Sequence, residues 1–303
     1  MGDVVILGVF VADTAYRAER MPRMGETILG NSFALGPGGK GSNQAVACAR
    51  LGAQTRFLTK LGQDEFARMA LRTWDEAGVT PHATAVAESY TGAAFIYVDE
   101  ATGDNAIIIA PGAAALIGAE DVEGWADMIK AASVFVTQLE QPLEAAMTAL
   151  KIARDNGVTT ILNPAPAADL PDGMLALCDY LTPNETETAA LVGFPVETPD
   201  DAARAAISLQ EKGVGTPIIT LGAQGAYLHG HGLVPAVHAG AVVETTGAGD
   251  AFNGALAAGL ADGLAPLDAV RLGCATAGLS VTRPGTAGSM PSRAEVNAVL
   301  AES

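Results

Sequence analysis

Residues 242–254 read VVETTGAGDAFNG, which places Gly247, Ala248 and Gly249 between an apolar run and a single carboxylate, Asp250. Such small residues leave the backbone exposed, and glycine also reaches dihedral angles that a Cβ atom forbids. The residues that follow, AFNGALAAGLADG (251–263), predict a helix, so the small residues lie at its N-terminus. Free N–H groups and the positive end of the helix dipole favour an anion at this position. An aspartate beside that anion site needs a chemical role of its own.

Outside this stretch, short apolar runs alternate with helical stretches along most of the chain. The predicted parallel strands are VVILGVFV (4–11), TRFLTKLG (55–62), SVFVTQLE (133–140), TTILNPAP (159–166), DYLTPNE (179–185) and PIITLG (217–222). The predicted helices, SNQAVACARLG, DEFARMALRTWDEAG, LEAAMTALKIARDNG and DAARAAISLQEKG, each end in a glycine that fits a C-terminal cap. This alternation predicts an α/β fold with a doubly wound, mostly parallel central sheet and helices on both faces. In such sheets, ligands bind beyond the carboxyl ends of the strands.

Two segments break the alternation. Residues 90–112, YTGAAFIYVDEATGDNAIIIAPG, contain two strand-like runs joined by DEATGD, which is typical of a β-hairpin. Residues 14–35 have few helix signals and contain Pro22, Gly25 and Gly30. We predict that these two segments form a small β-structured lid, inserted into an α/β domain of residues 1–13, 36–89 and 113–303.

The 303 residues carry a formal net charge of −17, and 49% of them are apolar while 17% are charged. The chain can therefore bury a large core, and its acidity argues against nucleic acid or an anionic membrane as the main partner. Three scattered cysteines without a C-x-x-C pair suggest neither a disulfide framework nor a zinc site. The first apolar run is too short to span a membrane, so we expect a cytoplasmic protein with buried thiols.

A second glycine-rich stretch, GPGGKGSNQAVACARLGA (36–53), also precedes a predicted helix, and it contains Lys40 and Asn43. Their side chains can donate hydrogen bonds to hydroxyl or phosphate oxygens. The stretch is not a P-loop, because Gly41 follows Lys40 where that motif has Ser or Thr. Residues 9–13 lack the glycine cluster of a dinucleotide fingerprint, which disfavours an NAD-linked dehydrogenase. Taken alone, the stretch fits a glycine-rich turn with a solvated lysine as well as a ligand site.

The two glycine-rich stretches together match the signature pair of the ribokinase-like (PfkB) family of sugar kinases. Residues 38–45, GGKGSNQA, are similar to the first signature, and residues 244–254 are similar to the second, DTTGAGD-F-x-G. Between them, TPNETE (182–187) resembles the N-x-x-E motif of the family, and TLGAQGAY (220–227) resembles its nucleotide-binding strand and loop. The resemblance runs in order over nearly the whole chain and includes LNPAPA (162–167) and VTRPG (281–285). It implies the ATP-dependent transfer of a phosphoryl group to the primary hydroxyl (O5) of a pentose, with D-ribose as the leading substrate.

The resemblance also implies roles for individual residues. Asp250 would be the catalytic base that accepts the proton of the sugar hydroxyl, and Gly247, Ala248 and Gly249 would form the anion hole for the transferred phosphoryl group. The aspartate thus has a role separate from that of the glycines. On their own, Asp13 fits a turn residue and Glu140 a surface charge, but both follow predicted strands on the ligand side of the sheet. The implied sugar contacts are Asp13, Gly39, Lys40, Gly41, Asn43, Glu140 and Asp250, with Val11 beside them.

For the nucleotide, the resemblance implies contacts from Asn184, Glu187, Thr220, Gly222, Gln224, Gly225, Gly249 and Cys274. Glu187 would help to hold a hydrated Mg²⁺, although the run N-E-T-E also fits a helix N-terminal cap with an acidic first turn. A monovalent cation, K⁺, would bind beside the anion hole, partly through backbone oxygens, at Glu244, Thr246, Ser280, Arg283, Gly285 and Ser289.

Two positions depart from the family pattern. Glu244 stands where the second signature begins with Asp, and because a carboxylate is kept we still predict activation by K⁺. Val11 stands where ribokinases have an Asn two residues before the sugar-binding Asp, and deoxyribokinases also carry an apolar residue there. Valine cannot bond a ring hydroxyl, and a buried hydroxyl left unpaired costs about 1–3 kcal/mol. A neutral strand-end residue is the simpler interpretation of Val11, so ribose leads, with 2-deoxyribose, other furanoses and nucleosides as alternatives.

Outside the enzyme class, the chain could be a non-catalytic sugar-binding regulator on a kinase scaffold. The presence of Asp250 behind the glycines disfavours that alternative, because a pure binding protein has no use for a base there. In this family the lids often pair across a dimer, so we predict a homodimer through residues 14–35 and 90–112.

Overall fold

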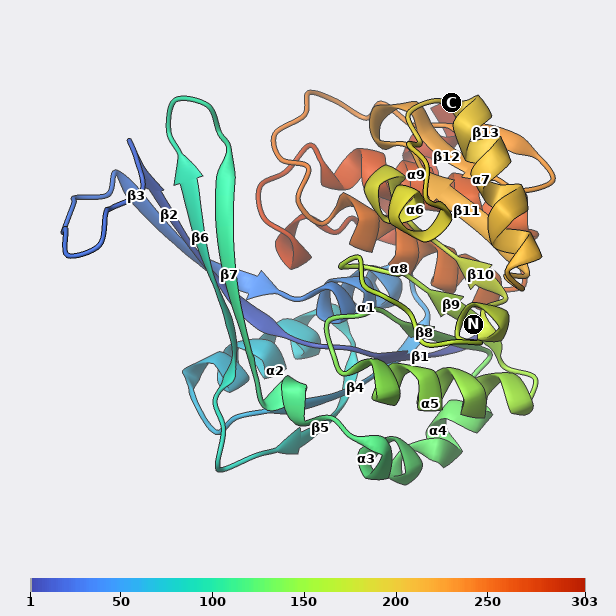
Figure 1. Ribbon diagram of the computed structural model, residues 1–303, viewed down its shortest axis with the longest axis horizontal. Helices are drawn as coiled ribbons and strands as arrows, with labels where there is room; N and C mark the ends of the chain where they lie inside the picture. Colours follow the sequence, from blue (N-terminus) through green and yellow to red (C-terminus); the bar gives the residue numbers. More distant parts are fainter. Residues whose placement is uncertain (1, 303) are drawn as a thin grey trace.

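The computed structural model describes residues 2–302 and contains a nine-stranded sheet and a separate four-stranded sheet (Figure 1). In the large sheet the strand order is β13-β12-β11-β10-β9-β8-β1-β4-β5. Neighbouring strands from β5 to β11 pair in parallel, and the two pairs that involve β12 are antiparallel. The strands are β1 (Asp3–Leu7), β4 (Gln54–Leu61), β5 (Thr80–Ala85), β8 (Val134–Thr137), β9 (Thr159–Leu162), β10 (Tyr180–Leu181), β11 (Thr216–Thr220), β12 (Gly225–Leu228) and β13 (Gly232–Pro235).

The predicted doubly wound, mostly parallel sheet is confirmed, but several predicted strands are too long, and one of them is divided between two sheets. The run 4–11 is not a single strand: β1 ends at Leu7, and Val11 begins the first strand of the small sheet. The chain leaves the large sheet at Gly8, which lies against Gly41 of the next helix, so the apolar run passes between two sheets while remaining buried. Strands β5, β12 and β13 were not predicted; β5 and β13 are the two edges of the sheet, and β12 lies next to β13.

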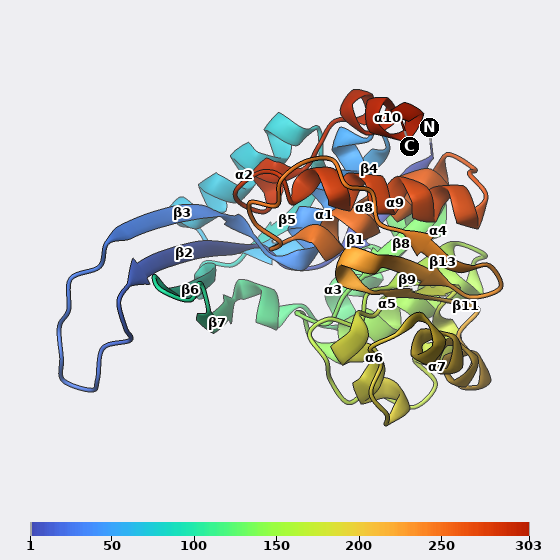
Figure 2. The ribbon, with the colours of Figure 1, turned by 90° about the horizontal axis from the view of Figure 1, so that it is seen from above.

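Helices cover both faces of the large sheet, as Figure 2 shows. Alternate residues of β1 point to opposite faces: Val4 and Ile6 belong to one buried apolar cluster, and Val5 and Leu7 belong to the other. The first cluster includes residues of α1 (Lys40–Arg50), α2 (Glu65–Ala77), α8 (Ala248–Ala261), α9 (Pro266–Ser280) and α10 (Arg293–Glu302). The second includes residues of α3 (Ala119–Gly124), α4 (Ala126–Ala131), α5 (Leu143–Asp155) and α7 (Pro199–Glu211), with α6 (Glu185–Val192) packed against it.

The predicted glycine caps are confirmed. Gly52, Gly78, Gly157 and Gly213 all follow helices and have positive φ. The structure adds four short 3₁₀ turns, η1 (Ala113–Leu116), η2 (Leu175–Leu177), η3 (Gly222–Gln224) and η4 (Ala287–Ser289). None of the helices described within residues 2–302 is long and apolar enough to cross a membrane.

The small sheet projects from one end of the molecule (Figures 1 and 2). Its strand order is β3-β2-β6-β7, built from β2 (Val11–Ala18), β3 (Ser32–Gly38), β6 (Thr91–Asp99) and β7 (Asn105–Gly112). The predicted hairpin at 90–112 is confirmed, because β6 and β7 pair antiparallel. β2 and β3 extend beyond residues 14–35. β2 follows β1 of the large sheet, and β3 leads into α1. Both ends of this first hairpin therefore lie next to the edge of the large sheet where ligands are expected.

The order of the strands locates that edge. Strands β4 and β5 lie on one side of β1 in the sheet, and the strands from β8 to β13 lie on its other side. Ligands bind beyond the carboxyl ends of the strands where the winding direction changes. Here that point lies between β1 and its neighbours β4 and β8.

Candidate active site

The two glycine-rich stretches meet at this edge because they begin two helices that pack against each other. Gly39 precedes α1 with φ 91° and Gly247 precedes α8 with φ 81°, a backbone conformation that favours glycine. Neither helix has a side-chain cap at its N-terminus. In α1 the N–H groups of Lys40 and Ser42 donate to Glu140 Oε2 and to the Val9 carbonyl, and in α8 the Ala248 N–H donates to the Thr245 carbonyl. Both helix dipoles favour an anion in the same region.

Asp250 lies in the first turn of α8 and is 7% exposed. Its Oδ2 accepts a hydrogen bond from Asn43 Nδ2 of α1 at 2.9 Å, and its Oδ1 accepts one from Gln44 Nε2 at 3.3 Å. Burial raises the pKa of Asp250, while Lys40 and the two amide donors oppose that rise. A partly desolvated carboxylate with a raised pKa is suited to accept a proton.

Two further carboxylates lie on the side of the small sheet. Asp13 is on β2, and Glu140 follows β8 and accepts a hydrogen bond from the Lys40 backbone N–H at 2.8 Å. Burial, together with the charges of Asp250 and Glu244, raises the pKa of Asp13 to about 6. Burial also raises the pKa of Glu140 to about 7, against the opposing effect of Lys40. These acceptors can bind several hydroxyl groups at once.

Lys40 stands among these acids. Burial alone would lower its pKa, but the charges of Asp250, Glu140 and Glu187 outweigh burial and raise it. Lys40 is half-buried and interacts electrostatically with these carboxylates, which favours a ligand site over a fully solvated lysine on a glycine-rich turn.

Two adjoining cavities surround the N-terminus of α8. The smaller, of about 160 Å³, is lined by Lys40, Asn163, Ala165, Thr182, Asn184, Glu187, Thr220, Gly247, Gly249, Asp250 and Asn253. The larger, of about 380 Å³, shares Asn184, Thr220 and Gly249 with it and is also lined by Gly222, Gly225, Ala248, Cys274 and apolar residues such as Val237, Phe252 and Val281. A polar compartment thus opens into an apolar one, as a phosphate chain attached to a flat base requires. The predicted nucleotide residue Gln224 does not line either cavity, and its amide donates to the Glu197 carbonyl at 3.4 Å.

Asn184 and Glu187 form a reciprocal cap at the start of α6. Asn184 Oδ1 accepts from the Glu187 N–H at 2.8 Å, and Glu187 Oε2 accepts from the Asn184 N–H at 2.9 Å. The helix-cap interpretation of this motif is therefore confirmed. Both residues also line the smaller cavity, and burial raises the pKa of Glu187 while the Asn184 backbone hydrogen bond opposes the rise. No group of three or more His, Cys, Asp or Glu side chains in the described part of the chain could hold a metal ion.

The predicted cation-binding residues come from two segments that the structure brings together. Glu244 Oε2 accepts a hydrogen bond from the Gly285 N–H at 2.8 Å, and Val281 O accepts from the Glu244 N–H at 3.2 Å. The Ser280 carbonyl accepts from the Arg283 N–H at 3.2 Å, and Ser289 is 1% exposed. Thr246 lies on the exposed turn before Gly247.

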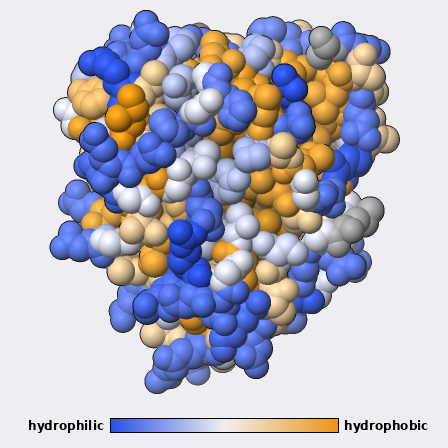
Figure 3. All heavy atoms as spheres, turned by 90° about the vertical axis from the view of Figure 1, so that its right-hand side faces the viewer, coloured by the Kyte–Doolittle hydropathy of each residue, from blue (hydrophilic) through white to orange (hydrophobic). Residues whose placement is uncertain are grey.

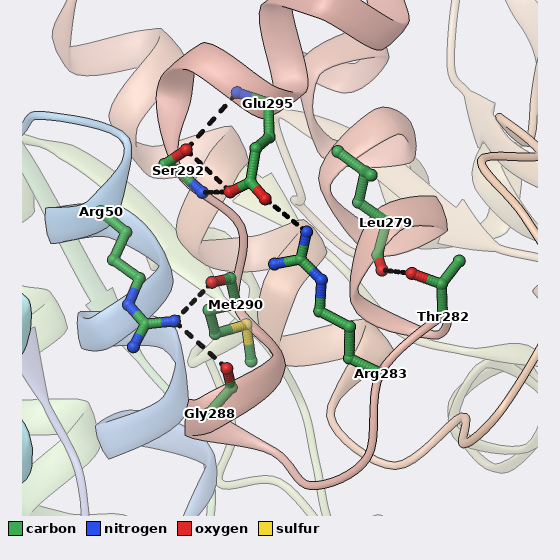
Figure 4. A network of polar contacts seen from close by, with 8 residues as sticks. All are labelled: Arg50, Leu279, Thr282, Arg283, Gly288, Met290, Ser292 and Glu295. Atoms are coloured by element: carbon green, nitrogen blue, oxygen red, sulfur yellow. Dashed lines mark hydrogen bonds and ion pairs between the residues drawn. The ribbon is translucent and has the colours of Figure 1, made fainter.

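The loop after α9 that contributes to this region is anchored on both sides (Figure 4). Arg50 of α1 donates to the carbonyls of Gly288 at 3.3 Å and Met290 at 2.5 Å, and Arg283 pairs with Glu295 of α10 at 2.5 Å. Thr286 Oγ1 donates to the Pro37 carbonyl at 2.7 Å, which joins the loop to the end of β3. The Arg283 side chain is thus engaged with Glu295, so only its backbone could face a cation.

Several buried polar residues at the site were missed by the sequence analysis. Asn163 and Thr182 directly follow β9 and β10, Gln138 follows β8, and Gln44 and Asn253 lie on α1 and α8. The runs 133–140 and 159–166 were interpreted as strands throughout, although each strand ends at the first polar residues. A polar residue immediately after an apolar strand was the signal that could have identified Gln138, Asn163 and Thr182.

This fold, with a buried carboxylate at the N-terminus of a central helix beside two adjoining cavities, is typical of small-molecule kinases. The pattern of the pfkB family of carbohydrate kinases matches residues 1–293, and the chain belongs to this family. A ribokinase of Staphylococcus aureus is 40% identical over 98% of this chain and 99% of that protein. A deoxyribokinase of Salmonella typhi is 36% identical over 98% of each. The structure of Arabidopsis thaliana ribokinase complexed with ribose and ATP superposes with a TM-score of 0.92 at 31% identity, over 99% of this chain and 98% of that one.

Proposed function

We propose that this carbohydrate kinase transfers the γ-phosphoryl group of ATP to O5 of D-ribose and produces ribose 5-phosphate and ADP. The observation that carries the proposal is Asp250, buried and hydrogen-bonded to Asn43 at 2.9 Å where the N-termini of α1 and α8 meet. Sequence identity of 40% to a ribokinase, and 31% to the ribokinase whose structure contains ribose and ATP, supports the choice of sugar.

Each part of the reaction has residues suited to it. Asp250 accepts the proton of the O5 hydroxyl as that oxygen forms a bond to the γ-phosphorus. The bond between the γ-phosphorus and the oxygen that bridges it to the β-phosphate breaks, and ADP keeps that electron pair. The N–H groups of Gly247, Ala248 and Gly249, with Lys40, stabilise the charge on the transferred group. Asp13, Asn43 and Glu140 hold the ring hydroxyls, since they offer both donors and acceptors.

The nucleotide binds across the two cavities, with its phosphates in the smaller and its base in the larger, which contains Cys274, Gly222 and Gly225. Asn184 and Glu187 face the phosphate end and would hold a hydrated Mg²⁺ through its water ligands. Such an ion supplies charge neutralisation on the phosphate oxygens.

We further propose K⁺ as an activator. The segments that contain Glu244, Thr246, Ser280, Gly285 and Ser289 lie together beside the start of α8, which supports a site that orders the turn before Gly247. Equal activity in Na⁺ buffer and in K⁺ buffer would refute this proposal. The three buried free thiols agree with a reducing, cytoplasmic location, which stays a prediction.

The small sheet is proposed as the predicted lid and as the interface of a homodimer. Its strands expose a set of large apolar side chains, namely Tyr16, Phe33, Leu35, Ile107, Ile108 and Ile109. Contiguous exposed apolar residues on a soluble protein mark an interaction surface. On the side of the molecule opposite the small sheet, hydrophilic and hydrophobic residues are mixed (Figure 3). A monomeric mass by light scattering at micromolar protein would contradict the dimer.

A second candidate substrate is 2-deoxy-D-ribose. Val11 is 4% exposed, and it lies on the same face of β2 as Asp13, two residues away. An apolar side chain there fits a sugar that lacks a hydroxyl, and the deoxyribokinase at 36% identity supports this option. Other furanoses and nucleosides stand behind it.

The test measures ADP release from ATP and Mg²⁺ in K⁺ buffer with ribose and 2-deoxyribose side by side. A higher kcat/KM for ribose supports the proposal, and a higher value for the deoxy sugar selects the second candidate. Absence of release with every pentose and nucleoside tested would favour the non-catalytic sugar-binding alternative.

A further inference from the structure

A chain of buried side-chain amides leads to Asp250 from behind the site. Gln138 Nε2 donates to Gln44 Oε1 at 2.6 Å, and Gln44 Nε2 donates to Asp250 Oδ1 at 3.3 Å and to Asn163 Oδ1 at 3.2 Å. Asn163 Nδ2 in turn donates to the Thr182 carbonyl at 2.9 Å. Gln44 and Gln138 are fully buried, and neither lines the two cavities, so the proposed reaction gives them no direct role.

The neighbours of Gln44 allow its amide only one orientation. Asn163 must present its oxygen to Gln44, because its nitrogen is bound to a carbonyl. The ionised Asp250 can only accept. If the Gln44 amide were flipped, its oxygen would face both of these oxygens, and two hydrogen bonds would be replaced by repulsion. The Gln44 N–H groups therefore point at the carboxylate.

Close packing holds Gln138 in place behind Gln44. A Cβ atom on Gly8 would lie 2.5 Å from Gln138 Oε1, and one on Gly41 would lie 2.7 Å from it. Both positions must therefore be glycine for this amide to fit. Gly41, predicted as a sugar contact, packs here against Gln138, so its conformation supports the amide chain.

We propose that Gln44 is a positioning residue for the base. It holds the Asp250 carboxylate in a fixed rotation about the bond to its Cβ atom and, by donating to Oδ1, favours the ionised form that accepts the sugar proton. The proposal rests on the proposed role of Asp250. It is distinct from the role of Asn43, which donates to the other carboxylate oxygen, Oδ2, and keeps that bond when Gln44 is replaced.

Other charged groups also act on Asp250, and they set the background for any measurement. Lys40 of α1 stabilises its ionised form, while Asp13 of β2, Glu140 after β8 and Glu187 of α6 interact with it as like charges. None of these groups is hydrogen-bonded to Gln44, so a substitution there leaves them in place.

The test compares Gln44→Leu and Gln44→Glu with the wild type. Leucine keeps the volume and removes the donor, so we expect kcat to fall about 10- to 100-fold at neutral pH while the KM for the sugar stays within about threefold. The acid limb of the pH profile of kcat/KM should move up by about one pH unit, because one hydrogen bond to the charged form is lost. Glutamate keeps the shape and places a second acid against Asp250, so the acid limb should move further in the same direction.

Gln141→Leu is the matched control. Gln141 is equally buried, and its amide donates to the Gln138 carbonyl and to Thr137 Oγ1 with no contact to Asp250. Its loss should lower the melting temperature and leave the acid limb in place. If Gln44→Leu lowers only the melting temperature, or lowers kcat with an unchanged acid limb, the positioning role is refuted.

A readout without turnover separates this inference from the proposed function. The ¹³C resonance of the Asp250 carboxyl carbon, assigned with Asp250→Asn, can be titrated in the wild type and in Gln44→Leu. An upward pKa shift of about one unit supports the inference even if no tested sugar is phosphorylated, and equal titration curves overturn it even in an active kinase.

Discussion

Val11→Asn tests how this site distinguishes ribose from 2-deoxyribose. Side chains two residues apart on a strand share a face, so an amide at position 11 would point to the same side as Asp13. Val11 is 4% exposed, which leaves no bulk water to solvate that amide. With ribose bound, the amide can pair with a ring hydroxyl, and with 2-deoxyribose one of its groups stays unpaired.

The magnitude follows from the cost of an unpaired buried polar group, about 1–3 kcal/mol. This corresponds to an increase of about 5- to 150-fold in the ratio of kcat/KM for ribose to kcat/KM for 2-deoxyribose. Coupled measurement of ADP release with both sugars gives the ratio directly. Val11→Ala is the control, because it changes volume without adding a polar group, and its ratio should stay within about threefold of the wild type. A ratio that changes less than twofold in Val11→Asn would show that position 11 does not contact the distinguishing hydroxyl.

Three other changes follow from the same geometry. Asp250→Asn should lower kcat about 10²- to 10⁴-fold with little change in the KM for ribose, and near-normal kcat would remove Asp250 from the role of base. Burial raises the pKa of Glu140 from 4.5 to about 7, so above pH 4.5 the unfolded chain ionises more readily than the folded one. The melting temperature of Glu140→Gln relative to wild type should therefore rise between about pH 4.5 and 7 and level off above pH 7; a pH-independent difference would contradict the raised pKa. In Gly254→Ala the new Cβ would lie 2.5 Å from the Gln44 carbonyl oxygen. We therefore expect the free energy of unfolding, measured with denaturant, to fall by about 1–3 kcal/mol, and kcat to fall with it. Gly124→Ala is the control, because the space around Gly124 is open, and its stability should be close to that of the wild type.

The sequence was sufficient for the central sheet because its strands are short apolar runs between helices that end in glycine. It failed where the local pattern continues across a change of sheet. VVILGVFV is apolar throughout, and the break between Leu7 and Val11 depends on Gly8 contacting Gly41, a residue distant in sequence. Strands β12 and β13, GAYL and GLVP, each begin with a glycine, and they lack the uninterrupted apolar run of the equally short strand β8, VFVT.

For the site, the glycine-rich stretches located both helix N-termini, and the structure brings Lys40, Asn43 and Asp250 together as the predicted roles require. The roles themselves stay predictions. Gln44 could not be identified, because an isolated glutamine in a helix has no pattern, and the position of Gln138 directly after an apolar strand marks the residue without showing its partner. Their importance arises from contacts between positions 44, 138 and 250, which only the folded chain defines.

A net charge of −17 opposes the binding of an anion such as ATP, and the composition of the two cavities resolves the conflict. Lys40 is the only lysine or arginine among the residues that line them. Attraction for phosphate must then come mainly from backbone N–H groups at the start of α8, which carry partial positive charge without a long, flexible side chain. Such donors are fixed before substrate binds and need no reorganisation as charge develops on the transferred group. They also tolerate the nearby carboxylates that the sugar requires, because a fixed dipole, unlike a mobile cation, cannot turn away from the phosphate to pair with Asp13, Glu140 or Asp250. Gly247 makes both roles possible, since it starts α8 without a side-chain cap directly beside Asp250, whereas at the start of α1 the Lys40 N–H already pairs with Glu140.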